Sequence, residues 1–410
     1  MALLKGNAIV GQSGGPTSAI NATLSGVIRG AADSDAIEKL YGMINGIEGF
    51  LEGNIIDLSG LFFDEKKLSS LELTPASALG SCRKKLPPLS EDLGLYQRIF
   101  EIFKSHNIRY FFYIGGNDSM DTVYKLSEYA KTVDYEIRVV GVPKTIDNDL
   151  PEIDHTPGFG SAAKFIATAT KEIATDCSVY KVKAVTIVEM MGRDSGWLTC
   201  AAALPRLNSD VAPDLVYLPE VDFDMDNFMD DVRAALEVHP NVVVAVSEGA
   251  RFADGTYVGA SAQSGVTDAF GHAYLSGTGK ALELAVKEKI GCKVRSVELN
   301  ILQRCASHIA SKTDLDESVM VGSAAVKAAV EGTTGKMMTY VRTSDDPYKV
   351  ECSSEDIQKI ANMVREVPRE FINERGNNVT DECLKYIAPL TYGEPDIKYV
   401  NGLPVHFVIK

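Results

Sequence analysis

The segment from Pro143 to Asp149 holds the richest group of chemically useful side chains in the sequence. It reads Pro-Lys-Thr-Ile-Asp-Asn-Asp and follows a Val-rich run that is typical of a buried strand. One carboxylate can take a proton from a hydroxyl nucleophile, another can help to hold a metal ion, and Lys144 can neutralise a phosphate. This set favours phosphoryl transfer, although a solvated turn also collects such residues.

Glycine-rich turns follow two other apolar runs. Gly14 and Gly15 come after the first run of the chain, and a similar turn begins at Gly115. Glycine lets backbone N–H groups approach an anion, and the N-terminus of a following helix favours negative charge. We expect Thr17 or Ser18 to cap the first of these helices. An ordinary tight turn needs the same glycines, so neither turn decides the question alone.

Two further features concern phosphate binding. Arg193 follows another apolar run, and Arg83 lies in a run of three basic residues. Arginine holds phosphoryl groups through paired hydrogen bonds, although a surface ion pair would explain either residue equally well. Both Gly-Lys pairs of the chain are followed by residues without a hydroxyl group, Ala281 and Met337. This excludes an NTPase with a Walker-type phosphate loop.

Short runs rich in Val and Ile alternate along the chain with stretches of helical character. This alternation predicts a doubly wound α/β fold, built as two such units. Ligands of open α/β sheets bind at the carboxyl ends of the strands, where the turns described above lie. The expected strands are 7–10, 110–114, 137–142, 184–189, 215–218, 242–246 and 294–299, and the expected helices are 18–31, 120–130, 195–204, 227–238, 278–290 and 318–330.

The composition excludes several classes of partner. The 410 residues carry 41 basic and 56 acidic side chains, a net charge of −15, which disfavours binding to nucleic acid or to an anionic membrane. The apolar runs are shorter than a membrane span, and the N-terminus lacks the apolar region of a signal peptide. The seven scattered cysteines form no C-x-x-C pair, so we expect reduced thiols in a cytoplasmic chain without structural zinc.

Six short motifs occur in the order seen in phosphofructokinases of the family A type, which the chain therefore resembles. The resemblance implies two Rossmann-like lobes with the active site in the cleft between them. It also implies Mg²⁺-dependent phosphoryl transfer to the 1-hydroxyl of fructose 6-phosphate. Residues 1–157 with 303–358 would form the phosphoryl-donor lobe, and 158–302 with 359–410 the fructose 6-phosphate lobe. The motifs are SGG (13–15), GGND (115–118), PKTIDND (143–149), MGR (191–193), SEGA (247–250) and LQR (302–304).

The resemblance also implies a role for each motif position. Asp147 is similar to the base that takes the proton from the sugar hydroxyl. Thr145 and Asp149 match its neighbours that position the sugar and the metal, and Arg193 matches the residue that stabilises the transferring phosphoryl group. The implied contacts to fructose 6-phosphate are Met191, Gly192, Glu248, Arg304 and, from a neighbouring subunit of a homodimer or homotetramer, Arg295; those to the donor are Gly14, Gly15, Arg83 and Lys144.

Two positions in these motifs bear on the phosphoryl donor. Asp118 and Lys144 stand where members of the family that use ATP have glycines. A carboxylate at 118 would repel the α-phosphate of a nucleotide and fill its space, while a lysine at 144 can neutralise the released phosphate. The resemblance is therefore to the pyrophosphate-dependent branch. Asn117 stands where most members have an aspartate associated with Mg²⁺; an amide oxygen is a weaker ligand, so Asp118 or Asp149 would hold more of the metal.

Three alternatives stay open from the sequence. The donor is ATP in the first alternative. In the second alternative the acceptor is another sugar phosphate, such as sedoheptulose 7-phosphate. This alternative stays open because Ile301 stands where some members have a histidine or tyrosine against the sugar phosphate. The third alternative is a catalytically silent regulatory subunit, against which the intact Asp147, Asp149 and Arg193 argue.

Overall fold

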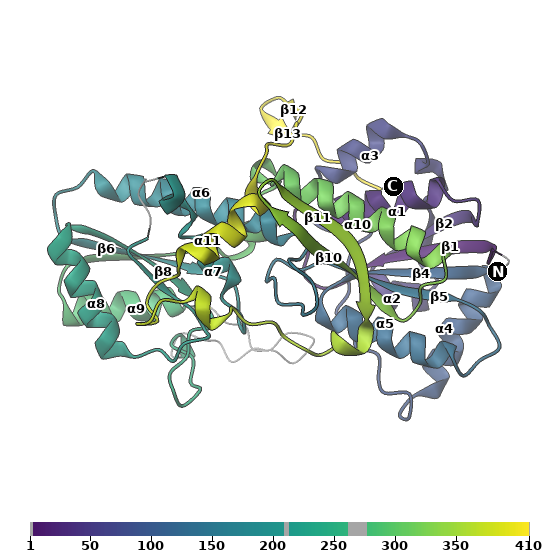
Figure 1. Ribbon diagram of the computed structural model, residues 1–410, viewed down its shortest axis with the longest axis horizontal. Coiled ribbons are helices and arrows are strands. Elements are labelled where there is room, and N and C mark those ends of the chain that lie inside the picture. The colour runs from purple at the N-terminus through teal and green to yellow at the C-terminus, as the bar shows by residue number, and fades with distance from the viewer. Residues whose placement is uncertain (1–2, 209–212, 261–276, 410) are drawn as a thin grey trace.

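The chain folds into two α/β lobes that lie side by side. The computed structural model describes residues 3–208, 213–260 and 277–409. Figure 1 shows the first lobe at the right, with the N-terminus at its outer end, and the second lobe at the left. Each lobe contains a sheet of parallel strands covered by helices. This is the Rossmann-like two-lobed architecture that the motifs implied.

The first lobe is built on a seven-stranded sheet in the order β11-β10-β5-β4-β1-β2-β3. Neighbouring strands from β10 to β2 are parallel, and the two edge strands β11 and β3 are antiparallel to their neighbours. Of these strands, only β1, β4 and β5 were expected. The strands are β1 (Gly6–Gln12), β2 (Ile37–Met43), β3 (Ile55–Asp57), β4 (Ile108–Gly115), β5 (Arg138–Pro143), β10 (Lys336–Asp345) and β11 (Tyr348–Asp356).

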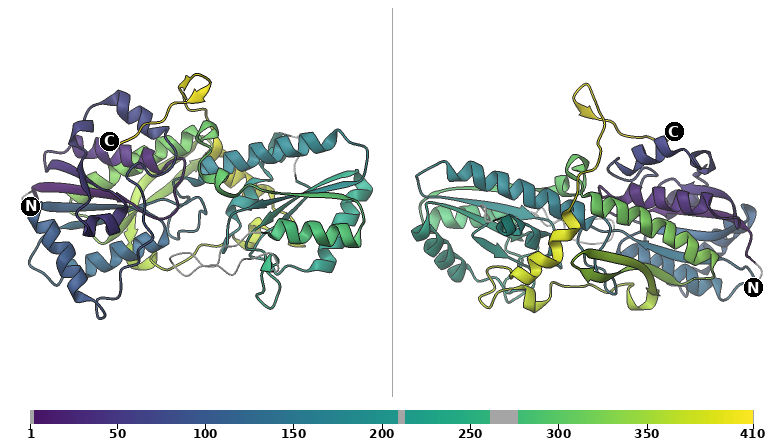
Figure 2. Two further views of the ribbon diagram at one scale, coloured as in Figure 1. Left: turned by 180° about the vertical axis from the view of Figure 1, so that it is seen from behind. Right: turned by 45° about the horizontal axis from the view of Figure 1, so that its top comes forward.

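Helices cover both faces of the first sheet. In Figures 1 and 2, α1, α3 and α10 lie on one face, and α2, α4 and α5 on the other. The helices α1 and α10 approach closely at Gly26 and Gly322, where a Cβ atom would lie 2.1 and 2.2 Å from carbonyl oxygens of the opposite helix. The helices are α1 (Ile20–Ala32), α2 (Gly46–Leu51), α3 (Glu65–Glu72), α4 (Leu93–Ser105), α5 (Asn117–Ala130) and α10 (Lys312–Val330).

The start of α1 differs from the sequence prediction. Ala19 occupies the N-cap position, and no side chain caps the helix there. The Thr17 hydroxyl accepts a hydrogen bond from the N–H of Ala19 at 3.2 Å, which forms a local turn just before the helix. The expected capping by Thr17 or Ser18 is therefore wrong, because the helix begins one to two residues later; Thr17 instead lines the interlobe pocket.

The second lobe is built on a four-stranded parallel sheet in the order β7-β8-β6-β9. Alternate residues of β6 point to opposite faces: Val185 and Ile187 pack towards α8 and α9, and Val188 and Met190 pack towards α6, α7 and α11. All four strands were expected. The elements are β6 (Ala184–Met190), β7 (Leu215–Tyr217), β8 (Asn241–Ser247), β9 (Lys293–Glu298), α6 (Phe159–Ser178), α7 (Trp197–Ala201), α8 (Met225–Val238), α9 (Thr278–Lys289) and α11 (Asp381–Ile387).

The C-terminal part of the chain contacts both lobes. Apolar side chains between residues 367 and 390 lie in the core of the second lobe. A projecting hairpin of β12 (Tyr399–Val400) and β13 (Leu403–Pro404) follows, and the chain then returns to the first lobe near α3 (Figure 2). There the N–H of Phe407 donates to the Thr74 hydroxyl at 2.7 Å, and Phe407 and Ile409 pack on the core. The prediction assigned all of residues 359–410 to the second lobe. The last of these residues instead pack on the first lobe, because their apolar side chains cover its surface.

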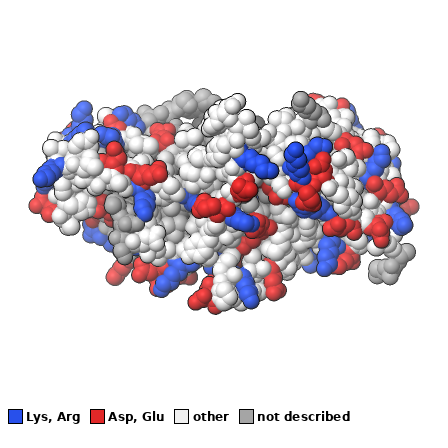
Figure 3. Space-filling view, turned by 90° about the horizontal axis from the view of Figure 1, so that it is seen from above, with Lys and Arg blue, Asp and Glu red and all other residues white. Residues whose placement is uncertain are grey.

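Four features complete the description. Short 3-10 turns occur at Ser59–Leu61, Leu204–Asn208, Asn300–Arg304, Ser307–Ile309, Ile357–Lys359, Arg369–Phe371 and Ala388–Thr391. Acidic and basic side chains are interspersed on the face shown in Figure 3. None of the helices in the described parts of the chain combines the length and apolar character needed to cross a bilayer. All seven cysteines are free thiols.

Candidate active site

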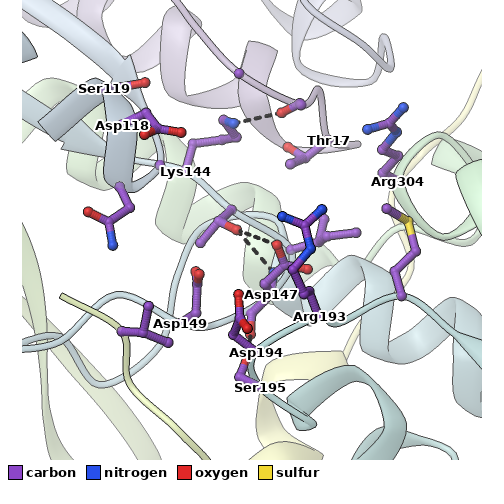
Figure 4. Close-up of a pocket in the computed structure, with 18 of the residues that line it drawn as sticks. Thr17, Asp118, Ser119, Lys144, Asp147, Asp149, Arg193, Asp194, Ser195 and Arg304 are labelled. Atoms are coloured by element: carbon purple, nitrogen blue, oxygen red, sulfur yellow. Dashed lines mark hydrogen bonds between the residues drawn. The ribbon is translucent and has the colours of Figure 1, made fainter. Parts of the chain in front are cut away.

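A pocket of about 420 Å³ lies between the two lobes and collects nearly all of the predicted site residues. Figure 4 shows their side chains converging on this space from both lobes. The pocket is lined by Gly14, Gly15, Pro16, Thr17, Arg83, Lys85, Gly116, Asn117, Asp118, Ser119, Lys144, Thr145, Ile146, Asp147, Asp149, Met191, Arg193, Asp194, Ser195, Glu248, Arg304, Asn362 and Val364.

The topology of the two sheets explains this position. In the first sheet, β1 and β4 are neighbours, and the chain leaves them in opposite directions, towards β2 and β5. In the second sheet, β6 and β8 are neighbours, and the chain leaves them in opposite directions, towards β7 and β9. The carboxyl ends of such strand pairs form a crevice in each sheet, and ligands of α/β proteins bind there. The pocket joins the two crevices.

The turn after β5 places Asp147 in the pocket. The N–H of Asp147 donates to the Thr145 hydroxyl at 3.1 Å, and this hydroxyl donates to the Asp147 carboxylate at 3.4 Å. The Ser195 hydroxyl, from the second lobe, donates to the main-chain carbonyl of Asp147 at 3.2 Å. Asn148 adopts a left-handed conformation with φ of 54°, which asparagine tolerates better than most residues. The turn is therefore held from both lobes.

Burial changes the acidity of both carboxylates in this turn. It raises the pKa of Asp147, while the opposite charges of Lys144 and Arg193 act to lower it. It also raises the pKa of Asp149 to about 7, and the like charge of Asp147 adds to this effect. A carboxylate whose pKa is raised is a stronger proton acceptor, which suits the role of a general base.

Lys144 is a buried cation between two turns of the first lobe. Its side chain is 3% exposed, and its Nζ donates to the carbonyl of Gly15 at 2.6 Å (Figure 4). Burial lowers the pKa of Lys144 to about 8. Gly14 has φ of 78°, and a Cβ atom on it would lie 3.4 Å from the lysine Nζ, so glycine is needed there for its backbone conformation. A phosphate entering this corner would meet a preplaced ammonium group.

Asp118 lies in the first turn of α5, whose N-terminus faces the pocket. Its carboxylate pairs with the ammonium group of Lys85 at 2.8 Å. The N-terminal end of a helix attracts anions, so phosphate oxygens near Gly116 would be stabilised. Lys85 was not among the predicted site residues, although it lies in the basic run that contains Arg83.

Asn117 has a structural task that the sequence did not indicate. Its side-chain amide donates to the carbonyl of Met363, and its Oδ1 accepts from the N–H of Asn362 at 2.5 Å. A metal ion would therefore have to share this oxygen with a main-chain donor. Asn117 and Asp149 both line the pocket, and the metal role of each stays a prediction.

The second-lobe wall is held by hydrogen bonds to the main chain. The N–H of Met191 donates to Gln303 Oε1 at 3.2 Å, and the N–H of Gly192 donates to Glu248 Oε1 at 3.2 Å. Gly192 has φ of 126°, and a Cβ atom on it would lie 2.5 Å from a main-chain oxygen. Gly192 thus supports the wall without lining it. Burial raises the pKa of Glu248 to about 8.

Two arginines predicted to bind fructose 6-phosphate lie in different places. Arg304 lines the pocket, and a Cβ atom on Gly15 would lie 3.1 Å from its Nη1, so it reaches across to the first lobe. Arg295 is exposed on the edge strand β9, opposite Thr186. It borders a separate small cavity beside Tyr180 and does not line the pocket of its own chain.

The structure adds pocket residues to those predicted from the motifs. Asp194 and Ser195 directly follow the MGR motif, and Thr17 follows the first glycine turn, so their proximity in sequence could have indicated them. Asn362 and Val364 lie more than 200 residues from the turns they approach, and no sequence signal marks them.

Comparisons with known proteins agree with this geometry. A family model described as phosphofructokinase matches residues 7–329. The chain is 42% identical over 401 residues to a pyrophosphate–fructose 6-phosphate 1-phosphotransferase of Halomonas elongata, covering 97% of this chain and 94% of that protein. It is 31% identical over 368 residues to a sulfofructose kinase of Alkalicoccus urumqiensis, covering 89% and 92%. The crystal structure of a pyrophosphate-dependent phosphofructokinase from Nitrosospira multiformis has a TM-score of 0.87 at 38% identity, covering 97% and 95%.

Proposed function

The chain belongs to the phosphofructokinase family, and we propose that it transfers a phosphoryl group from pyrophosphate to the 1-hydroxyl of fructose 6-phosphate. The products are fructose 1,6-bisphosphate and orthophosphate. Pyrophosphate cleavage is less strongly driven than a nucleotide-dependent step, so the reaction runs in both directions.

One observation carries this proposal: a buried lysine and a half-buried pair of carboxylates share one pocket. Lys144 supplies positive charge for phosphate, while Asp147 supplies a base whose pKa is raised by burial. Phosphoryl transfer needs positioning, charge neutralisation and one base, and it needs little covalent chemistry from the protein. The names of the relatives supply the two substrates.

The proposed step balances as follows. Asp147 accepts the proton of the 1-hydroxyl, and the oxygen attacks the nearer phosphorus of pyrophosphate in line. A new O–P bond forms, the bridging P–O bond breaks, and its electron pair leaves with orthophosphate. Arg193 and Arg83 stabilise the charge on the transferring group, and Lys144 neutralises the leaving phosphate. Gly14 and Gly15 leave room for the donor beside Lys144.

Mg²⁺ is part of the proposal. Asp147 and Asp149 are half-buried carboxylates with raised pKa values, so a cation beside them would be favoured. Asp149, helped by Asp118 or by the amide oxygen of Asn117, would hold the ion together with donor phosphates and water, as Mg²⁺ prefers. When bound, Mg²⁺ neutralises the charge of the pyrophosphate oxygens.

Asp118 is the proposed cause of donor choice. Its carboxylate lines the pocket at the N-terminus of α5. By resemblance to the members of the family that use ATP, the α-phosphate of a nucleotide would need this space. Two like charges placed together weaken binding strongly. Pyrophosphate has no third phosphate to place there, so it escapes this penalty.

The acceptor side of the proposal includes a second copy of the chain. Met191, Glu248 and Arg304 would contact fructose 6-phosphate from one chain, and Gly192 would support this wall through its hydrogen bond to Glu248. Arg295, which lies outside the pocket of its own chain, would reach the pocket of a neighbour in a homodimer or homotetramer. We place the enzyme in the cytoplasm, where seven free thiols would stay reduced.

A paired assay tests the function. The purified chain is given fructose 6-phosphate and Mg²⁺ with either pyrophosphate or ATP, and fructose 1,6-bisphosphate is measured. We expect turnover with pyrophosphate only. Turnover with ATP only would overturn the donor assignment and keep the family. Silence with both donors would reject this acceptor and lead to tests of other sugar phosphates and sulfofructose.

A further inference from the structure

A segment near the C-terminus crosses from the first lobe to the second beside the pocket. We call residues 361–367 the strap. In Figure 1 it belongs to the yellow-green connection that leaves the end of β11 and runs towards the second lobe. The strap lies beyond the residues matched by the family model, which end at 329. Two of its residues, Asn362 and Val364, line the pocket, and Arg365 follows directly.

One end of the strap is fixed to the first lobe at α5. The N–H of Asn362 donates to Asn117 at 2.5 Å, and its side-chain amide donates to the carboxylate of Asp121 at 3.1 Å. Asp121 is also paired with Lys125 at 2.6 Å. The strap is therefore attached to the helix whose N-terminus faces the phosphoryl donor.

The next contacts join Arg365 to the turn that carries the two half-buried carboxylates. Its Nε and Nη2 donate to the carbonyl of Asn148 at 3.2 and 2.9 Å. Its Nη1 donates to the carbonyls of Ile153 and Asp154 at 2.5 and 2.7 Å. Its main-chain N–H donates to the carbonyl of Asp149 at 2.7 Å. One residue thus holds four main-chain carbonyls of the segment that begins directly after the base.

This task suits arginine in particular. A guanidinium group has five N–H donors in one rigid plane, whereas a lysine ammonium is a single point of charge. The plane is also fixed from the second lobe: the guanidinium carbon lies 4.9 Å from the ring centre of Trp197, and the indole N–H donates to the carbonyl of Arg365 at 3.2 Å. Asn148, which receives two of the bonds, has the left-handed φ of 54°. Arg365 therefore fixes a conformation that the turn does not readily adopt alone.

We propose that Arg365 is a positioning residue for phosphoryl transfer: it holds the main chain at Asn148 so that the neighbouring Asp147 carboxylate stays aimed at the sugar hydroxyl. The inference rests on the proposed function, because it requires Asp147 as the base. Arg365 does not line the pocket, and it acts through the main chain rather than on the reacting atoms.

The test compares two arginines of the same segment. Arg369 donates three hydrogen bonds to the main-chain carbonyls of Ile372, Asn373 and Glu374, none of which lines the pocket. Arg365→Met and Arg369→Met therefore remove a similar set of contacts, one beside the base and one remote from it. Arg365→Lys keeps the charge and part of the bonding.

We expect Arg365→Met to lower kcat about 100-fold, since a small displacement of a catalytic group has an effect of this size. The KM values for both substrates should change less than about threefold, because the acceptor wall is untouched. Arg365→Lys should recover about tenfold of the loss. Arg369→Met should match the wild type in kcat and KM.

Several results would overturn the proposal. They are a kcat of Arg365→Met within threefold of the wild type, an equal loss in Arg369→Met, or a loss that appears mainly in KM. Far-ultraviolet circular dichroism reports whether each variant is folded; the emission of Trp197 is unsuitable because it would respond directly to the loss of the adjacent Arg365 guanidinium. If Arg365→Met does not fold, the folded Arg365→Lys variant tests the proposal in its place: its loss should again appear in kcat and not in KM. A wild type that is inactive with pyrophosphate would defeat the proposed function instead; activity with ATP would still allow the comparison of arginines.

Discussion

The two walls of the pocket are built on the same principle and contain different kinds of group. Both consist of turns at the carboxyl ends of parallel strands. The turn after β5 contains three groups with altered acidity, the buried Lys144 and the half-buried Asp147 and Asp149. The turn after β6 is shaped mainly by main-chain N–H groups, which donate to Gln303 and Glu248. The groups with altered acidity are therefore clustered on the first wall, whereas the form of the second wall is set mainly by its main-chain hydrogen bonds.

Because the two walls differ in this way, substitutions on the first wall and on the second wall should have different effects. On the first wall, removing a charge should change the rate or the choice of donor, because the reacting groups are stabilised by charge. On the second wall, an uncharged side chain of the same shape should be tolerated near neutral pH. Arg193 and Arg304 are the informative exceptions, since both bring a positive charge from the second wall to Asp147.

The largest effect is expected at the base. Asp147→Ala should lower kcat by about 10³-fold, since a positioned base contributes between about 10² and 10⁴. Binding of fructose 6-phosphate, measured by calorimetry, should change little because the second wall remains. Asp149→Ala serves as the comparison. If Asp147→Ala kept more than a tenth of the wild-type rate, the assignment of the base would be wrong.

A smaller effect is expected from removing the buried cation. Lys144→Met should raise the KM for pyrophosphate about 10²-fold while leaving the KM for fructose 6-phosphate within threefold, because an ion pair with phosphate in a dry site is worth several kcal/mol. The pH dependence gives an independent check. The pKa of Lys144 is lowered to about 8, so the free enzyme loses this charge as pH rises through 8.

In wild-type enzyme kcat/KM for pyrophosphate should therefore fall above pH 8, since this ratio reports the free enzyme. The value of kcat should fall later, because bound pyrophosphate favours the charged lysine. Arg83→Met is the matched control: it removes another cation of the pocket and keeps Lys144, so the fall above pH 8 should persist. A flat profile up to pH 9.5 would show that Lys144 is not the group that meets the donor.

Donor choice should respond to two first-wall positions together. The double variant Asp118→Gly with Lys144→Gly should raise the ratio of ATP to pyrophosphate turnover by at least about tenfold, which corresponds to about 1.4 kcal/mol. Removing the carboxylate opens space for a nucleotide, and removing the lysine weakens pyrophosphate. Lys85 should be tested in parallel, because it pairs with Asp118 at 2.8 Å. An unchanged ratio in the double variant would locate donor choice elsewhere.

The comparison also explains what the sequence could reveal. The first wall was predictable because its charged residues are adjacent in the chain, as in 144–149, and follow a run that reads as a buried strand. All seven expected strands and all six expected helices are present. Their ends differ by a few residues; α10, for example, begins at Lys312, six residues before its expected start, because Ser311 caps it.

Some of the elements that were not predicted lack a clear sequence pattern, and others have a pattern that was not used. The helix α6 begins with Phe-Gly-Ser and contains several threonines, which are weak helix formers, so its length depends on packing in the second lobe. The helix α4 has apolar residues at 96, 99, 100 and 103 and an Asp92 cap, a pattern that could have been used. The strap could not be predicted, because Arg365 and Asn362 meet their partners only in the folded chain.

The smallest effect is expected on the second wall, at Glu248. Its pKa is raised to about 8 by burial, so the carboxyl group is largely protonated at pH 7. Glu248→Gln keeps the shape and the acceptor for the Gly192 N–H, and its KM for fructose 6-phosphate at pH 7 should stay within about threefold of the wild type. Glu248→Ala, which removes that acceptor, should raise this KM about tenfold or more.

The raised pKa of Glu248 also predicts how the stability of the folded chain changes with pH. Between about pH 4.5 and 8 the unfolded chain has released the Glu248 proton while the folded chain still holds it, so the folded state binds more protons and stability falls as pH rises. This contribution is fully present below pH 4.5 and lost above pH 8. Glutamine does not titrate, so denaturant unfolding of Glu248→Gln should show a shallower decline across this window than the wild type. Parallel pH profiles for the two proteins would mean that Glu248 is ionised in the folded chain, and the second wall would then contain buried charge like the first.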